Sequence, residues 1–169
     1  MTIGASFAQE LMAETATTRR VLERVPEDRL TWRPHPKSMS LGQLAMHVAT
    51  LPRQVVGFLG GDELDVSVAA SGTPEGASRA ELLEALNSSL SEAAAYFETL
   101  PDTRAAEVWS LKSGAQTLLA IPRTGALRSL LFNHWYHHRG QLTVYLRLLD
   151  VPLPSVYGPT ADENPFQAI

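Results

Sequence analysis

Four segments of the chain repeat apolar residues every three or four positions, and this periodicity constrains the fold more than any other feature. In an α-helix, residues at that spacing share one face, so each segment predicts an amphipathic helix. The expected helices cover residues 6–25, 41–58, 78–97 and 124–149. Four such helices must bury their apolar faces against one another, so the chain is predicted to be all-α, a four-helix bundle.

Capping residues support the starts of the second and third helices. Ser40 is followed three positions later by Gln43, and Ser78 is followed three positions later by Glu81; Ser38 is the alternative cap of the second helix. Both pairs match the capping box, in which the two side chains satisfy backbone N–H groups at a helix start. Pro52 lies inside the second helix and predicts a kink there.

The connections between the expected helices are unequal. Residues 62–76 form a long polar connection, so a simple up-down topology with short loops is not assured. Residues 103–122 are ambiguous and are compatible with a loop that holds extended pieces at 107–111 and 117–121. The last stretch, 155–169, has too few apolar residues to form an independent element.

Length and composition narrow the class of protein. A chain of 169 residues predicts one domain, 1–169, with a single core. The formal net charge of −4 opposes nucleic-acid binding, which needs a basic surface. No apolar run approaches the ~20 residues that span a bilayer, so no membrane partner is expected. Residues 1–9 lack the basic start and apolar stretch of a secretion signal, and a cytoplasmic protein is expected.

Three histidines fall on the apolar faces of two expected helices. His134 and His138 are four residues apart and therefore lie one turn apart on one face, while His47 lies between Leu44 and Leu51 on another helix. Because the chain has no cysteine, a transition-metal site must use imidazole, carboxylate and water. Three imidazoles with one open position are typical of a catalytic metal site. The alternative is that these histidines are structural and bind no metal.

Three further residues near this set receive weaker assignments. His137 is interpreted as a neighbour of the site or a surface residue, and His35 as an exposed loop histidine. Glu14 shares the apolar face of the first helix, where it could orient a ligand imidazole. The preferred interpretation of Glu14 is a carboxylate at the helix edge with its charged end in water.

Several sequence strings resemble the DinB/YfiT-like superfamily of metal-binding helical bundles. They are Leu-Gly-Gln-Leu-Ala-Met-His-Val-Ala around His47, Asn-His-Trp-Tyr-His-His-Arg-Gly-Gln-Leu at 133–142, Val-Tyr-Gly-Pro-Thr-Ala-Asp-Glu at 156–163 and Leu-Thr-Trp-Arg-Pro at 30–34. The resemblance covers nearly the whole chain. It implies an up-up-down-down or related topology with a long crossover and an ordered tail. It also implies a divalent metal held by His47, His134 and His138, and a homodimer.

The resemblance further implies candidate activities, because the superfamily includes thiol-dependent S-transferases and a thiol-dependent isomerase. The predicted function is a divalent-metal-dependent enzyme, a thiol S-transferase or a hydrolase, with Zn, Ni or Fe activating a low-molecular-weight thiol or water against a small-molecule substrate. Arg139 is a candidate for binding an anionic cofactor, or equally a solvated helix residue. The alternative function is a non-catalytic, dimeric, metal-binding bundle that acts in stress response or ligand binding.

Overall fold

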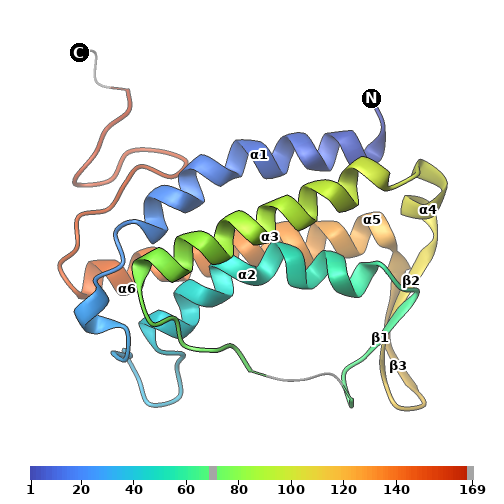
Figure 1. Ribbon diagram of the computed structural model, residues 1–169, viewed down its shortest axis with the longest axis horizontal. Helices are drawn as coiled ribbons and strands as arrows, with labels where there is room; N and C mark the ends of the chain where they lie inside the picture. Colours follow the sequence, from blue (N-terminus) through green and yellow to red (C-terminus); the bar gives the residue numbers. More distant parts are fainter. Residues whose placement is uncertain (69–71, 167–169) are drawn as a thin grey trace.

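The computed structural model describes residues 1–68 and 72–166, and four long helical rods pack side by side along its length (Figure 1). The rods are α1 (Ile3–Leu22), α2 (Leu41–Leu59), α3 (Arg79–Thr99) and a continuous fourth helix. That fourth helix consists of α5 (Arg123–Ala126), the π-helical segment η2 (Leu127–Asn133) and α6 (His134–Leu148). Two shorter helices complete the described helical elements: η1 (Glu27–Arg29) and α4 (Asp102–Ala106). Among the described residues, no helix is long and apolar enough to cross a membrane.

The direction of the rods explains the long connection that the sequence predicts. Figure 1 shows α2 and α3 running in the same direction, antiparallel to α1 and to the fourth helix. Two parallel neighbours can be joined only by a chain that returns along the whole bundle. The connection from residue 60 to 78 makes this return; of its residues, 69–71 lie outside the described part of the chain.

The predicted caps start the second and third helices. At α2 both halves of the capping box are present, with Ser40 Oγ accepting from the Gln43 N–H and the Gln43 side chain accepting from the Ser40 N–H. At α3 the Ser78 hydroxyl accepts from the Glu81 N–H. The first helix begins three residues earlier than predicted because Thr2 caps it.

The prediction of an all-α fold is wrong, because a small mixed sheet closes one end of the bundle. It contains β1 (Glu63–Asp65), β2 (Val108–Ser113) and β3 (Gln116–Pro122) in the order β1-β2-β3. β1 pairs with β2 in parallel, and β2 pairs with β3 as an antiparallel hairpin. The two extended pieces predicted within 103–122 correspond to β2 and β3, whereas β1 lies within residues 62–76, for which the sequence predicts a polar connection.

The hairpin has a local cause. Ser113 pairs with Gln116, which leaves a two-residue turn that begins with Gly114 at φ +57°. Two-residue hairpin turns favour glycine where φ is positive. Trp109 on β2 is fully buried, and its indole N–H donates to the Phe58 carbonyl at 3.3 Å, which attaches the sheet to the end of α2.

A buried arginine holds the same end of the molecule together. The Arg123 side chain has no exposed surface. Its guanidinium donates to the carbonyls of Leu59, Arg104 and Gly61 at 2.9, 3.0 and 2.6 Å, and to Asp62 at 3.2 Å. The bonds to Leu59 and Gly61 satisfy carbonyls that the end of α2 leaves without helical partners. Together, the bonds of Arg123 join α2, α4 and the fourth helix where the sheet begins.

The π-helical segment corrects the predicted apolar face of the fourth helix. The sequence assigns Leu130, His134 and His138 to the core face, but these three are half-buried, whereas Trp135 and Arg139 are fully buried. An i→i+5 turn holds more residues than an α-helical turn, so it rotates every later side chain about the axis. The histidines therefore lie at the border of the core.

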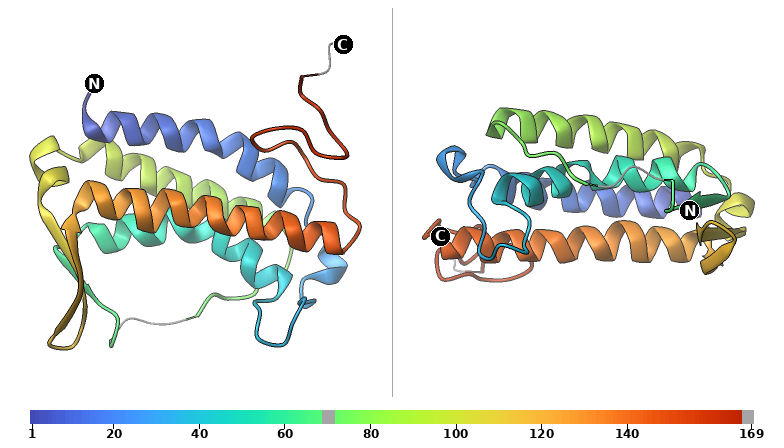
Figure 2. Two further views of the ribbon diagram at one scale, coloured as in Figure 1. Left: turned by 180° about the vertical axis from the view of Figure 1, so that it is seen from behind. Right: turned by 90° about the horizontal axis from the view of Figure 1, so that it is seen from below.

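The tail packs against the bundle without forming a helix or strand in its described part. Glu163 pairs with Arg20 on α1 at 2.5 Å, and Asp162 pairs with Arg147 on α6. Figure 2 shows the tail folding back beside these two helices. Residues 167–169 lie outside the described residues.

Candidate metal centre

The structure brings together the three histidines that the sequence selects. His47 comes from α2, and His134 and His138 come from α6, which runs alongside α2 (Figure 2). Each offers one ring nitrogen, and these three nitrogens lie within 4.8 Å of one another. The ring of His47 lies 5.3 Å from that of His134 and 4.5 Å from that of His138, centroid to centroid. We call His47, His134 and His138 the histidine triad.

Pro52 contributes to this meeting of helices. Proline has no N–H, so the Val48 carbonyl four residues earlier loses its helical hydrogen bond. The indole N–H of Trp135 donates to that carbonyl at 2.8 Å, and both groups are buried. Trp135 is adjacent to His134, and Val48 is adjacent to His47. A single hydrogen bond thus fixes α6 against α2 beside two members of the triad.

The second ring nitrogen of each histidine has its own partner. His134 Nδ1 lies 3.2 Å from the Leu130 carbonyl, and His138 Nδ1 lies 2.7 Å from Gln141 Oε1. Both partners are acceptors, so each Nδ1 carries the proton and each Nε2 keeps its lone pair for a ligand. His47 Nδ1 lies 3.4 Å from the Thr73 hydroxyl. The two α6 histidines direct Nε2 toward each other at 2.7 Å.

Burial keeps the triad neutral. Loss of water, reinforced by the neighbouring His138 and His134, lowers the pKa of His47 to about 4. Desolvation also lowers the pKa of His134 and of His138. Neutral imidazole is the form that binds a metal ion, and three such nitrogens are a donor set suited to Zn, Ni or Fe. The residues present therefore fit a divalent transition metal.

An apolar cavity of about 190 Å³ adjoins the triad on one side. Its lining includes His47 and His134 but not His138, so it opens beside two of the three histidines. Residues of α2, of β1, of β2 and of the fourth helix form its walls. The sheet that corrects the fold prediction is thus also a wall next to the candidate centre.

The predictions for His137, His35 and Glu14 have different outcomes. His137 and His35 are exposed, in agreement with their interpretation as surface and loop residues. The preferred interpretation of Glu14 is wrong, because its carboxylate is only 16% exposed and pairs with Arg139 at 2.6 Å. The alternative role of orienting an imidazole is not observed either, since its other side-chain partner is the Tyr157 hydroxyl at 2.9 Å.

Both interpretations of Arg139 are also wrong. Its side chain is 1% exposed, so it is not solvated, and its donors already have partners within the chain. Besides Glu14, it donates to the Thr18 hydroxyl at 3.0 Å and to the Tyr157 hydroxyl. The rings of Tyr136 and Tyr157 lie 5.2 and 5.0 Å from the guanidinium carbon. We call Arg139, Glu14, Thr18, Tyr136 and Tyr157 the arginine cluster; it joins α1, α6 and the tail.

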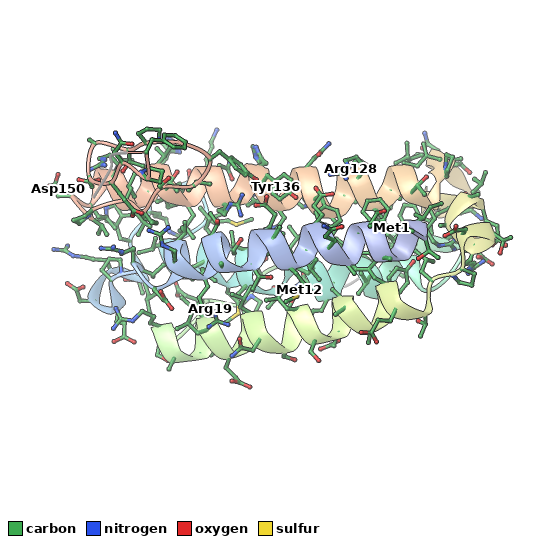
Figure 3. The ribbon with its side chains drawn as sticks, turned by 90° about the horizontal axis from the view of Figure 1, so that it is seen from above. Met1, Met12, Arg19, Arg128, Tyr136 and Asp150 are labelled. Atoms are coloured by element: carbon green, nitrogen blue, oxygen red, sulfur yellow. The ribbon has the colours of Figure 1, made fainter. Side chains whose placement is uncertain are left out.

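A second, more exposed contact joins the fourth helix to α1. Arg128 donates to both carboxylate oxygens of Glu10 at 2.7 and 2.6 Å, and the Tyr136 hydroxyl donates to Glu10 at 2.7 Å. Figure 3 shows Arg128 and Tyr136 on the fourth helix beside α1. These contacts fix the face of the helix that points away from α2.

Sequence reasoning missed the residues that support the triad. Gln141 lies three positions after His138, a spacing that allows contact on a helix, and this was an available signal. Trp135 carried a weaker signal, because its role depends on a carbonyl that Pro52 frees on another helix. Thr73 and the sheet residues of the cavity reach the triad only through the tertiary fold.

Comparison with solved structures shows the same fold in other proteins. A DinB-like protein from Bacillus cereus ATCC 10987 has a TM-score of 0.70 at 22% identity, covering 89% of this chain and 95% of that one. A DinB-like protein from Bacillus subtilis (YjoA) has a TM-score of 0.68 at 18% identity, covering 89% and 97%. A protein from Exiguobacterium sibiricum 255-15, described as a DinB family member, has a TM-score of 0.62 at 19% identity, covering 92% and 97%.

Sequence comparison agrees with the structures. The uncharacterized protein YrdA of Bacillus subtilis (strain 168) is 44% identical over 39 residues, which is 23% of this chain and 23% of YrdA. The short match therefore spans under a quarter of that relative. The family model described as the DinB family matches residues 1–165. Since that match covers nearly the whole sequence, the chain belongs to the DinB family.

Proposed function

We propose that this chain is a divalent-metal-dependent enzyme whose histidine triad holds Zn, Ni or Fe. The observation that supports this most directly is the set of three neutral imidazole nitrogens within 4.8 Å, contributed by two helices. Two of the imidazoles also have Nδ1 bonded to an acceptor, which is the usual arrangement around protein-bound metals. No cysteine competes as a ligand.

The proposed chemistry is activation of a small-molecule thiol, with water as the alternative nucleophile. A bound divalent ion lowers the pKa of a coordinated thiol or water enough for it to lose its proton near neutral pH. The chain's own residues hold the three imidazoles in position, and the apolar cavity adjoins two of them. Because the chain has no thiol of its own, sulfur chemistry here requires a bound thiol, as in an S-transferase.

Metal content of protein purified without a polyhistidine tag tests the first half of the proposal. We expect about one ion per chain, lost in His47→Ala, His134→Ala and His138→Ala but kept in the matched control His137→Ala. That control removes an exposed histidine from the same helix. Wild-type protein that binds no divalent metal, or a His137→Ala protein that loses it equally, would contradict the assignment.

Activity of the metal-loaded protein tests the second half. We expect it to accelerate conjugation of at least one low-molecular-weight thiol with a small electrophile, and the triad variants to lack this acceleration. A metal-loaded protein that is inactive with a panel of thiols and electrophiles would contradict the proposed transferase activity.

The resemblance also supports a homodimer. Light scattering of the protein as it elutes from a size-exclusion column should then give about twice the chain mass of 18.4 kDa.

A further inference from the structure

The cavity beside the triad is lined by apolar side chains from α2, β1, β2 and the fourth helix. One face of α2 supplies residues at helical spacing, including Leu51, Val55 and Phe58. The sheet supplies Trp109 and Leu111 from β2. Among the described residues that line it, none carries a formal charge, and Gln54 is the one polar side chain besides the two histidines.

Most of the walls of this cavity belong to the packed interior of the molecule. Trp109 has no exposed surface and is fixed by its hydrogen bond to the Phe58 carbonyl. Leu51 and Val55 are 1% and 6% exposed and belong to the main core. Phe58, at 43% exposed, lies at the opening. An apolar space with one exposed edge suits a ligand that enters from solvent and leaves its water shell behind.

The size of the cavity limits what it can hold. An engineered protein cavity of ~150 Å³ with apolar walls stays dry and binds benzene. The present cavity, at about 190 Å³, has room for one six-membered ring or a short branched alkyl chain. It has no room for a nucleotide or a peptide, and no charged group to bind a phosphate or carboxylate.

We infer that this cavity binds the apolar part of the substrate: an uncharged aryl or short alkyl group on a molecule whose donor atom reaches the histidine triad. The inference rests on the proposed function, because it takes the triad as the place where the donor atom binds. It adds that selection among substrates comes from the apolar group, and that Leu111 of β2 is a specificity-determining residue.

Cobalt-loaded full-length protein provides the test, because a thiolate bound to Co(II) gives a charge-transfer absorption. Titration compares phenylmethanethiol with 2-mercaptoethanol, thiols of similar acidity that differ in their apolar group. We expect phenylmethanethiol to bind roughly 10- to 100-fold more tightly, the range for burying one aromatic side chain. Equal affinities would overturn the inference while leaving the metal site intact.

A matched pair of variants locates the effect. Leu111→Trp fills the cavity and should remove the preference for phenylmethanethiol over 2-mercaptoethanol. Leu118→Trp places the same ring on β3 at a side chain that is 48% exposed, and it should keep the preference. If Leu111→Trp does not fold, the smaller Leu111→Phe replaces it. A preference that survives in the folded Leu111 variant would contradict the assignment.

A metal-free arm separates failure of the cavity from failure of the proposed function. Toluene titrated into the metal-free full chain should shift the methyl NMR resonances of Leu51 and Leu111 but not that of Leu118. If cobalt does not bind and toluene does, the metal proposal fails and the apolar site stands. If toluene causes no selective shift, the cavity is not a ligand site, whatever the metal result.

Discussion

The histidine triad and the arginine cluster share α6, with His138 and Arg139 adjacent in sequence, yet the two groups are built differently. Arg139 is 1% exposed and meets a carboxylate, hydroxyls and two aromatic faces, all within the chain. The triad is half-buried, directs two Nε2 atoms at each other and borders a cavity. A polar group whose partners are all internal stabilises the fold, whereas one with lone pairs left over is available to bind something else.

Arg139→Met should give the largest effect on stability, because it leaves the Glu14 carboxylate without its buried partner. Removing one member of a buried pair costs about 3 to 5 kcal/mol. The measurement is urea unfolding of the metal-free protein. The folded Arg139→Met protein should still bind one metal ion per chain.

The double variant Arg139→Met, Glu14→Gln is the control, since it removes both charges and should recover part of that loss. His134→Ala provides the opposite case, with metal binding lost and the unfolding free energy of the metal-free protein changed by less than about 1 kcal/mol. If His134→Ala proves as destabilising as Arg139→Met, the distinction between the two groups is wrong.

Trp135→Phe tests the bond that couples α6 to α2. The Val48 carbonyl would then be buried without a partner, which costs about 1 to 3 kcal/mol. Pro52→Ala restores an N–H that can bond this carbonyl, so it should stabilise the Trp135→Phe protein more than it changes the wild type. Unfolding of the four proteins as a double-mutant cycle measures the coupling. Equal effects of Pro52→Ala in both backgrounds would contradict this role of Trp135.

Much of this architecture follows from the sequence, and the parts that do not follow have identifiable causes. The caps at Ser40 and Ser78 act locally, so the sequence predicts them. Helical spacing and the resemblance single out the three histidines of the triad, but their meeting depends on the packing of α6 against α2. The sheet does not follow from the sequence, because β1 is three residues long and gains its stability from pairing with β2, 47 positions away in the chain. Local sequence patterns give no information about a pairing over that distance.

The roles of Glu14 and Arg139 escaped prediction for a related reason. Each looks like an ordinary charged residue on its own helix, and only packing of α1 against α6 makes them partners. The π-helical turn before His134 adds to this, since it rotates Arg139 into the core, where a regular helix would place Leu130 and His138.

Gln141→Leu tests whether the triad depends on support from its own helix. Without the amide oxygen, His138 loses the acceptor that fixes its Nδ1 proton and its ring orientation. Loss of such a partner weakens metal binding by roughly 10- to 100-fold. Competition with a chelator measures the affinity. Gln141→Glu keeps an acceptor at this position and should bind metal at least as well as wild type; equal weakening by both would show that Gln141 acts only through packing.

Glu10→Gln should give the smallest change in the free energy of unfolding, because exposure to solvent limits how much an ion pair contributes to stability. The hydrogen bonds from Arg128 hold the pKa of the Glu10 carboxyl below its usual 4.5, against the opposing effect of burial. When the pKa of a carboxyl is lower in the folded protein than in the unfolded chain, its ionised form stabilises the fold. This stabilisation is fully present at a pH above the unfolded-state pKa, and it is lost as the pH falls through the folded-state pKa. Glu10→Gln should therefore cost about 1 kcal/mol at pH 7, discounted because both partners are partly exposed.

The same difference between Glu10→Gln and wild type should shrink as the pH drops below 4.5 and vanish once Glu10 is protonated in both states. Unfolding midpoints measured from pH 7 to pH 3 follow this change. Glu10 and Glu14 lie four residues apart on α1 and each pairs with an arginine of the fourth helix, and the Glu10 pair is the more exposed of the two. A Glu10→Gln penalty as large as that of Arg139→Met, or one independent of pH, would mean that burial is not what separates the two.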